Sequence, residues 1–251
     1  MAHFYDCNDT MDSFLREDIT TAAQARKVSA TFPSVTTVLG ICKDEFLDSI
    51  YKPSKMVELG RENPYMHWRE IERLCYGMRK HPSDGSLIPS SEFGTAVHAR
   101  IEDLIQAQLH GHEVGESPYQ EWAAPFLEWM QVCDVKPIAT ECVVADKLIK
   151  IAGSVDFIGY DSEGKLFLAD YKCRTNTKGK AKCYDKDCQQ LGIEAYMLMK
   201  ERKLDYLPGC ISVIIDCDTK KHYHKVWNAK ELDKGIKVAK KCAELYWMLR
   251  M

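Results

Sequence analysis

The clearest pattern of apolar positions lies between Ser91 and His110, where apolar residues recur every three or four positions. One stripe is formed by Val97, Ile101, Leu104, Ile105 and Leu109, and a glycine follows as a stop signal. This spacing predicts an amphipathic helix over 91–110. A second helix is predicted from Ser117 through Trp129, because a serine, a proline and a glutamine stand at its capping positions.

The pattern changes to that of β-strands after residue 136. Three stretches alternate or run apolar with many β-branched side chains, and they cover 137–145, 148–160 and 165–172. We expect three neighbouring antiparallel strands. The remaining segments predict a helix over 186–203, strands over 210–217 and 222–227, and a last helix from the capping box at Asn228 to about Leu249. This order predicts an α+β fold with a mixed central sheet flanked by helices.

The N-terminal part shows weaker patterns. Residues 1–30 have no sustained period, so we expect a loosely ordered lead-in with at most a short helix near 20–28. Prolines break the stretch from Lys52 to Pro82 into helical pieces. We therefore predict a single domain over 31–251, in which a helical N-terminal extension (31–135) precedes the sheet core (136–251).

Within this extension, aromatic and basic residues are interleaved at Tyr65, His67, Trp68, Arg69, Arg73, Tyr76, Arg79 and Lys80. Such a mixture is compatible with a surface on which nucleic-acid bases stack. The alternative is that the aromatic residues belong to the hydrophobic core.

Composition narrows the function classes. The chain has 251 residues and 34 basic against 37 acidic side chains, so any phosphate-binding surface must be local. No apolar run is long enough for a membrane helix and the N-terminus lacks a signal peptide, so we expect a cytoplasmic protein, in the host cell if it is phage-encoded. The 11 cysteines share no C-x-x-C spacing, which favours reduced thiols over an iron–sulfur cluster or structural zinc. A Walker-type phosphate loop is absent from the sequence.

The residues best suited to chemistry lie near the ends of two of the predicted strands. Asp156 lies near the end of one strand and Asp170 near the end of the next, so the two carboxylates can converge. Lys172 stands two residues after Asp170 and therefore on the same face of the strand. Two carboxylates form an oxygen site for Mg²⁺ or Mn²⁺, and a nearby ammonium can orient water or stabilise charge on a phosphate. The alternative is an ordinary surface ion pair.

Several motifs in this order resemble the RecB-like branch of the PD-(D/E)XK nuclease superfamily, whose core is restriction-endonuclease-like. They are Gly153-Ser154-Val155-Asp156, then Leu166 to Lys172, then the helix that carries Gln189, Gln190 and Tyr196. The helix that begins Gly94-Thr95-Ala96-Val97-His98 is also similar to that branch, and Phe32 to Thr37 is similar to a signature of phage-type members.

The resemblance implies roles for individual residues. Asp156 and Asp170 would ligate Mg²⁺ or Mn²⁺ together with His98 and the backbone carbonyl of Tyr171, and Lys172 would be the catalytic lysine. Glu141 resembles an acidic residue often found ahead of the G-x-x-D motif. Without the resemblance, His98 reads as a partly buried helix residue and Glu141 as a solvated strand residue.

Two further groups are candidates for substrate binding. The resemblance implies that the helix with Gln189, Gln190 and Tyr196 lies beside the site, although the sequence leaves open which glutamine contributes. The loop after Lys172 is strongly basic and contains Arg174, Lys178, Lys180 and Lys182. Such a loop beside a metal site is suited to gripping a phosphate backbone without reading sequence.

Together these features predict a metal-dependent deoxyribonuclease that binds DNA, more in keeping with an exonuclease than with a site-specific endonuclease. The resemblance implies products that end in 5′-phosphate. The alternative is a non-catalytic nucleic-acid-binding or assembly subunit that retains the nuclease fold.

Overall fold

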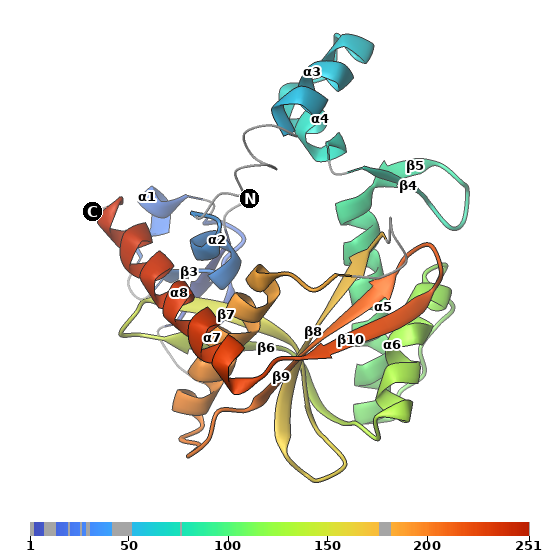
Figure 1. Ribbon diagram of the computed structural model, residues 1–251. Helices are drawn as coiled ribbons and strands as arrows, with labels where there is room; N and C mark the ends of the chain where they lie inside the picture. The colour runs from blue at the N-terminus through green and yellow to red at the C-terminus, as the bar shows by residue number, and fades with distance from the viewer. Residues whose placement is uncertain are drawn as a thin grey trace.

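The computed structural model describes residues 3–7, 14–19, 21–25, 27–28, 31–41, 52–75, 77–175 and 182–250. Its centre is a five-stranded sheet in the order β10-β9-β8-β7-β6 (Figure 1). The strands are β6 (Lys136–Asp146), β7 (Ile151–Tyr160), β8 (Leu166–Arg174), β9 (Gly209–Asp216) and β10 (Lys221–Val226). Strands β8 and β9 run parallel and the other neighbours run antiparallel, so the sheet is mixed.

Helices cover both faces of this sheet (Figure 1). One face packs against α5 (Ser90–His110) and α6 (Gln120–Val132), and the other against α2 (Val35–Leu39), α7 (Asp185–Glu201) and α8 (Ala229–Met248). Strand β8 serves both layers because its side chains alternate: Leu166 and Leu168 enter the α7–α8 core, whereas Phe167 and Tyr171 enter the α5–α6 core. The mixed sheet between helical layers is confirmed.

Most element boundaries agree with the sequence pattern, and two differ for local reasons. Strand β7 begins at Ile151 rather than at 148, because the carboxylate of Asp146 accepts hydrogen bonds from the backbone N–H groups of Leu148 (2.7 Å) and Ile149 (3.3 Å) and forms a turn. Helix α6 begins at Gln120, because Ser117 uses its hydroxyl in a short turn with the N–H of Tyr119.

Among the described residues, strands lie both in the lead-in expected over 1–30 and in the helical extension expected over 31–135, and the short helix expected near 20–28 is present. Strands β1 (Phe4–Asp6), β2 (Phe14–Leu15) and β3 (Thr31–Pro33) form a small antiparallel sheet, and the short helix α1 spans Ala22–Ala25. Phe4 is completely buried, in a cluster with Ile19 and Ala25. The division of the chain at residue 31 stays a prediction.

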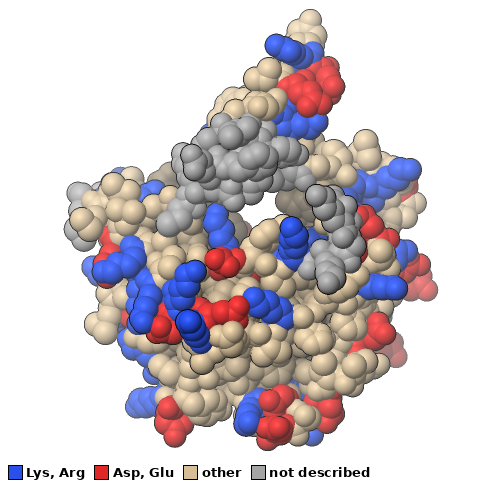
Figure 2. Space-filling view, in the orientation of Figure 1, with Lys and Arg blue, Asp and Glu red and all other residues tan. Residues whose placement is uncertain are grey.

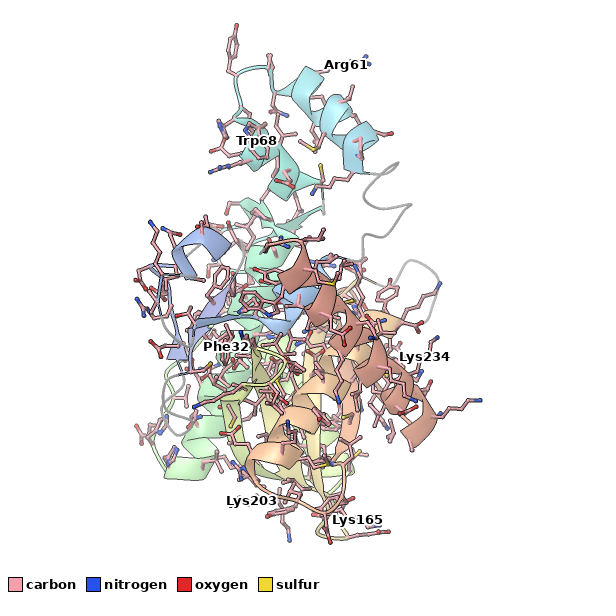
Figure 3. The ribbon with its side chains drawn as sticks, turned by 90° about the vertical axis from the view of Figure 1, so that its left-hand side faces the viewer. Phe32, Arg61, Trp68, Lys165, Lys203 and Lys234 are labelled. Carbon is pink, nitrogen blue, oxygen red and sulfur yellow. The ribbon has the colours of Figure 1, made fainter. Side chains whose placement is uncertain are left out.

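Helices α3 (Lys52–Glu62) and α4 (Trp68–Leu74) pack on each other and form what we call the arm, residues 52–75. A hairpin of β4 (Met78–Lys80) and β5 (Leu87–Pro89) connects the arm to α5. Figure 1 shows the arm beyond this hairpin at one end of the molecule, and Figure 3 shows Arg61 and Trp68 there.

Within the described ranges, no helix is both long and apolar enough to cross a membrane. The ten described cysteines are all free thiols.

Candidate active site

The site forms where two neighbouring strands part. The β7–β8 ladder runs from the Tyr160–Leu166 pair to the Phe157–Ala169 pair and ends there. Beyond this point β8 keeps pairing with β9 as far as Arg174, and β7 keeps pairing with β6. We call this opening between β7 and β8 the fork. Continuing the register by one step sets Asp156 opposite Asp170 at its mouth.

The two aspartates lie in the middle of their strands rather than near the strand ends, where the sequence placed them. Asp170 is only 1% exposed. The Nζ atom of Lys172 donates to Oδ1 of Asp170 at 2.5 Å, which places both side chains on one face of β8 as their spacing predicts. The backbone N–H of Tyr171 donates to Oδ2 of Asp156 at 3.3 Å and so bridges the fork.

The fork lets helices from opposite faces of the sheet reach the same carboxylates. From α5, the Nδ1 atom of His98 lies 3.9 Å from Oδ2 of Asp156, and its ring centroid lies 4.4 Å from that of Tyr171. From α7, the buried Glu194 packs against Gly153 of β7, where an added Cβ would lie 3.0 Å from its Oε1 atom. His98 therefore faces Asp156, and its role as a metal ligand stays a prediction.

The electrostatics of the fork show a surplus of buried acid. The pKa of Asp156 is raised to about 8, chiefly by burial; the charge of Lys172 lowers it and the charges of Asp170 and Glu141 raise it. Burial also raises the pKa values of Asp170 and Glu194. A carboxyl group that loses water and gains acidic neighbours holds its proton more tightly. The fork thus brings several buried carboxyl groups around the ammonium of Lys172.

The two basic groups respond in opposite ways. Burial alone would lower the pKa of Lys172, but the attraction of Asp170 and Asp156 outweighs it and raises this pKa, so the amine stays protonated. Burial, helped by the charge of Lys172, lowers the pKa of His98 to about 3. His98 is therefore a neutral imidazole at physiological pH, which is the form that can bind a metal ion.

The residues fit a divalent cation in their chemistry. Oδ2 of Asp170 is buried without a hydrogen-bond partner, and a buried carboxylate oxygen of this kind is a ligand that Mg²⁺ and Mn²⁺ accept. As the side chains stand, no three His, Cys, Asp or Glu residues in the described part of the chain are gathered closely enough to hold an ion. One reason is that Lys172 occupies the other oxygen of Asp170.

Glu141 lies on β6 beside the fork. Its neighbours Thr140 and Cys142 pair with Phe157 and Val155, so Glu141 is level with Asp156. The backbone of Glu141 has a positive φ of 48°, which is uncommon for a residue with a side chain. Its exposed carboxylate accepts a hydrogen bond of 2.7 Å from the hydroxyl of Ser154.

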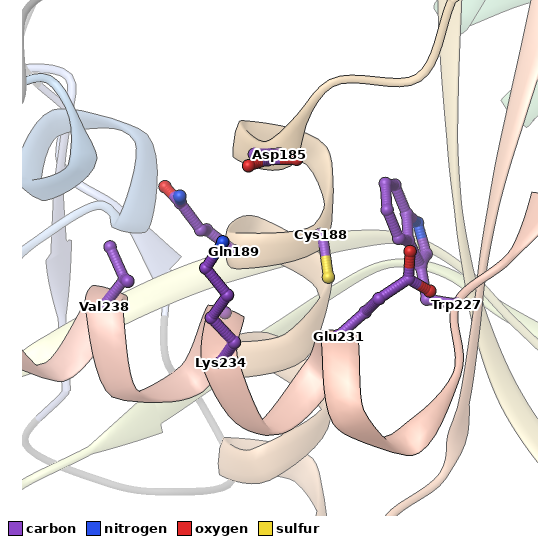
Figure 4. Close-up of a pocket in the computed structure, with 8 residues that line it drawn as sticks. Asp185, Cys188, Gln189, Trp227, Glu231, Lys234 and Val238 are labelled. Carbon is purple, nitrogen blue, oxygen red and sulfur yellow. The ribbon is translucent and has the colours of Figure 1, made fainter.

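Helix α7 turns different residues toward the site and away from it. Gln190 forms a side-chain hydrogen bond with Glu194, on the face toward the fork. Gln189 instead lines a cavity of about 170 Å³ between α7 and α8 (Figure 4), and Lys240 of α8 lies 3.5 Å from the ring centre of Tyr196. The structure therefore does not bring Gln189 and Tyr196 to the carboxylates. They share one helix face because they are seven residues apart, and α8 covers that face.

The basic loop is only partly described. The guanidinium of Arg174 makes a two-pronged ion pair with Asp187 (2.7 and 2.8 Å) and lies 4.6 Å from the ring centre of Tyr184. It fastens the end of β8 to the start of α7, so this side chain is already engaged within the protein. Lys182 is exposed, whereas Lys178 and Lys180 lie outside the described residues.

Glu194 is the site residue that the sequence analysis missed. It stands in an apolar stretch between Ile193 and Ala195, both buried. A glutamate in such a stretch, four residues after Gln190 on the helix that follows the D-x-K strand, is the signal that could have identified it.

No family model and no curated protein matches the sequence. Among solved structures, the chain is similar to the crystal structure of SSO0001, with 15% identity, a TM-score of 0.39, and coverage of 86% of this chain and 83% of that one. It is also similar to the alkaline exonuclease LHK-Exo from Laribacter hongkongensis, with 13% identity, a TM-score of 0.28, and coverage of 61% and 84%. The complex of LHK-Exo with dAMP gives 15% identity, a TM-score of 0.30, and coverage of 61% and 80%. All three similarities are distant.

Proposed function

We propose that the protein is a metal-dependent deoxyribonuclease of the PD-(D/E)XK type, with a restriction-endonuclease-like core. The observation that carries this proposal is the meeting of Asp156, Asp170 and Lys172 at the fork. A buried carboxylate and a partly buried one beside a protonated amine suit metal-assisted hydrolysis of a phosphodiester, in which the carboxylates hold the ion and the amine faces the phosphate. A surface ion pair, the alternative reading of the D-x-K triplet, does not fit an aspartate that is 1% exposed.

In this proposal, Asp156, Asp170, His98 and the carbonyl oxygen of Tyr171 hold Mg²⁺ or Mn²⁺. When bound, the ion would polarise the phosphate and lower the pKa of a water molecule. The unpartnered oxygen of Asp170 and the neutral ring of His98 support these assignments.

The remaining residues position and charge the site. Lys172 keeps its proton and can donate to a phosphate oxygen, which stabilises negative charge that develops during cleavage. Gln190 and Glu194 support β7 from the α7 side, where Glu194 lies against Gly153. Lys178, Lys180 and Lys182 contact the DNA backbone, while Arg174 holds the loop to α7.

The proposal further specifies an exonuclease that leaves 5′-phosphate ends. The exonuclease activity and the 5′-phosphate products are inferred from the order of the motifs, which is similar to that in the RecB-like branch and its phage-type members. The basic loop supports DNA binding without sequence readout, as a processive or general nuclease needs.

The test is cleavage of end-labelled DNA. Linear and circular DNA, single- and double-stranded, are incubated with Mg²⁺, Mn²⁺ or a chelator. We expect metal-dependent release of nucleotides from linear DNA, resistance of circles, and loss of cleavage in Asp170→Asn. Binding of DNA without any metal-dependent cleavage would contradict the proposal and favour the non-catalytic subunit.

A further inference from the structure

The arm exposes aromatic side chains at the end of the molecule. Tyr65 is 100% exposed and Trp68 is 54% exposed. The interpretation of these two rings as core residues is therefore wrong. Large aromatic side chains left in water on a projecting element are candidates for binding, because their burial on contact is favourable.

The arm is held together without these rings. Ile71 and Cys75 are its buried side chains, and an ion pair between Lys52 and Glu72 joins its two helices. Tyr65 lies in the turn between the helices and Trp68 is the first residue of α4. Removing either ring should consequently leave the arm folded.

Cations accompany the exposed rings. The guanidinium of Arg69 lies 5.3 Å from the ring centre of Trp68, and the ring of His67 lies 5.7 Å from it. Arg61 is exposed in the last turn of α3. Of the four glutamates of the arm, Glu58 and Glu72 form ion pairs with lysines, whereas Glu62 and Glu70 are exposed. Flat rings beside cations suit a ligand with flat bases and phosphates.

The hairpin that connects the arm to α5 touches the chain just beyond β8, the strand that carries Asp170 and Lys172. Arg79 of β4 donates to the hydroxyl of Thr175, three residues after Lys172, and forms an ion pair of 3.1 Å with Asp218. The arm therefore rises from the side of the sheet at which β8 ends (Figure 1). In the space-filling view, basic side chains lie on the face of the body below the arm (Figure 2).

We propose that Tyr65 and Trp68 form a stacking surface for the unpaired bases of single-stranded DNA. Bases in a duplex are stacked on each other and cannot stack on protein rings, so this surface favours a single strand. Arg61 and Arg69 contact its phosphates, and the exposed Lys80 continues the basic path toward the fork. Single-stranded DNA would then be the preferred substrate of the nuclease, and this preference rests on the proposed nuclease function.

The test measures binding without cleavage. Fluorescence anisotropy follows a labelled 20-nucleotide oligo(dT) and a blunt 20-base-pair duplex in the presence of EDTA. We expect Tyr65→Ala with Trp68→Ala to weaken binding of oligo(dT) by about tenfold or more, since stacking on each ring contributes substantially. Duplex binding should stay within about twofold. Replacing both residues with Phe keeps flat rings and should retain most of the affinity for oligo(dT).

A matched control removes two exposed rings elsewhere. Tyr160 and Tyr206 are 43% and 46% exposed. They are near Lys165 and Lys203 in the sequence, and Figure 3 shows these lysines at the end of the molecule opposite Trp68. Tyr160→Ala with Tyr206→Ala should leave oligo(dT) binding unchanged. Thermal melting checks that every variant is folded.

Three outcomes would overturn the inference. The first is unchanged oligo(dT) binding in the arm variant, and the second is an equal loss of binding for duplex DNA. The third is a change of oligomeric state, measured by sedimentation velocity, with no change in DNA binding. The arm would then be a contact between copies of the chain. Failure of the nuclease proposal is distinguishable. In that case oligo(dT) binding would still depend on the two rings, while Mg²⁺ would release no nucleotides.

Discussion

Glu194 places its carboxyl group over the bare Cα of Gly153, so that a Cβ atom there would lie only 3.0 Å from Oε1. The same Cβ would lie 3.1 Å from Cγ2 of Val35. Sterics therefore explain why the G-x-x-D motif has a glycine at position 153, because α7 and α2 both approach β7 at this residue.

Gly153→Ala should therefore destabilise the protein and disturb the fork. Glu194 and Val35 must both shift, and crowding of this kind costs about 1–3 kcal/mol of unfolding free energy. Urea unfolding measures the cost, and the cleavage assay measures the effect on the site. Gly115→Ala is the control, because an added Cβ at Gly115 has no neighbour within 4 Å. Equal stability of the two variants would refute the steric reason.

Asp170→Asn and Lys172→Ala should each reduce cleavage by at least about a hundredfold, because in the proposed nuclease one removes a charged metal ligand and the other removes the cation that would face the phosphate. Asparagine keeps the volume of the buried Asp170 side chain, and Lys172 is partly exposed, so both variants should fold. Circular dichroism checks the fold. Near-normal turnover in either variant, free of contaminating nuclease, would show that the site is misassigned.

His98→Ala should weaken Mn²⁺ binding by about tenfold or more, because a neutral ring next to Asp156 is removed as a ligand. Calorimetric titration with Mn²⁺ measures the affinity. His110→Ala, at the exposed end of the same helix, is the matched control and should bind Mn²⁺ as the unaltered protein does. If His98→Ala also binds normally, His98 is a packing residue of α5.

Asp146→Ala should lower the unfolding free energy by about 2–3 kcal/mol at pH 7, since the variant cannot form the hydrogen bonds that this buried charged group accepts. Burial alone would raise the pKa of Asp146, but the ammonium of Lys200 and the amides of Leu148 and Ile149 outweigh it and hold this pKa below its ordinary value. A lowered pKa in the folded state adds stability above the unfolded pKa, and the added stability is lost as pH falls.

The difference between Asp146→Ala and the unaltered protein should therefore shrink as the pH falls below about 4. Urea unfolding at pH 7 and pH 3 measures it, with Asp205→Ala at an exposed position as control. A difference that stays constant with pH would mean that the carboxylate acts only through packing.

A variant with Lys178, Lys180 and Lys182 replaced by alanine should bind DNA more weakly and with a shallower dependence on salt. Removal of a lysine that neutralises one phosphate reduces the slope of log affinity against log salt by up to about 0.7–0.9. The chemical step at saturating DNA should change less, because these lysines position the backbone. Titration in Ca²⁺ measures the slope, and alanine at Lys230, Lys237 and Lys241 on α8 is the control. An unchanged slope would make the loop a solvated surface.

The sequence predicted the helices and long strands well because their apolar residues repeat with a clear period. It also placed Asp170 and Lys172 on one face, which follows from the alternation of a single strand. It could not predict the fork, since this depends on β8 leaving β7 and continuing beside β9, a strand that is separated from it by a whole helix.

Two other features of the structure, the short N-terminal strands and the orientation of α7, also differ from the sequence-based expectations. Strands of two or three residues, such as β1 and β2, are too short to show a period, so residues 1–30 read as a lead-in. The shared face of Gln189 and Tyr196 was visible in the sequence, but tertiary packing decides that α8 covers it and that Glu194 faces the fork.

The fork also lowers the stability of the sheet at the place where the proposed activity needs the two carboxylates. Two adjacent strands that stop pairing give up the ladder hydrogen bonds between them, and the next pair of the ladder would join two like charges, Asp156 and Asp170. Neutral residues at both positions would let β7 and β8 close further and would strengthen the sheet. Selection for a more stable protein alone would then tend to close the fork, so the opening persists only while its carboxylates are needed.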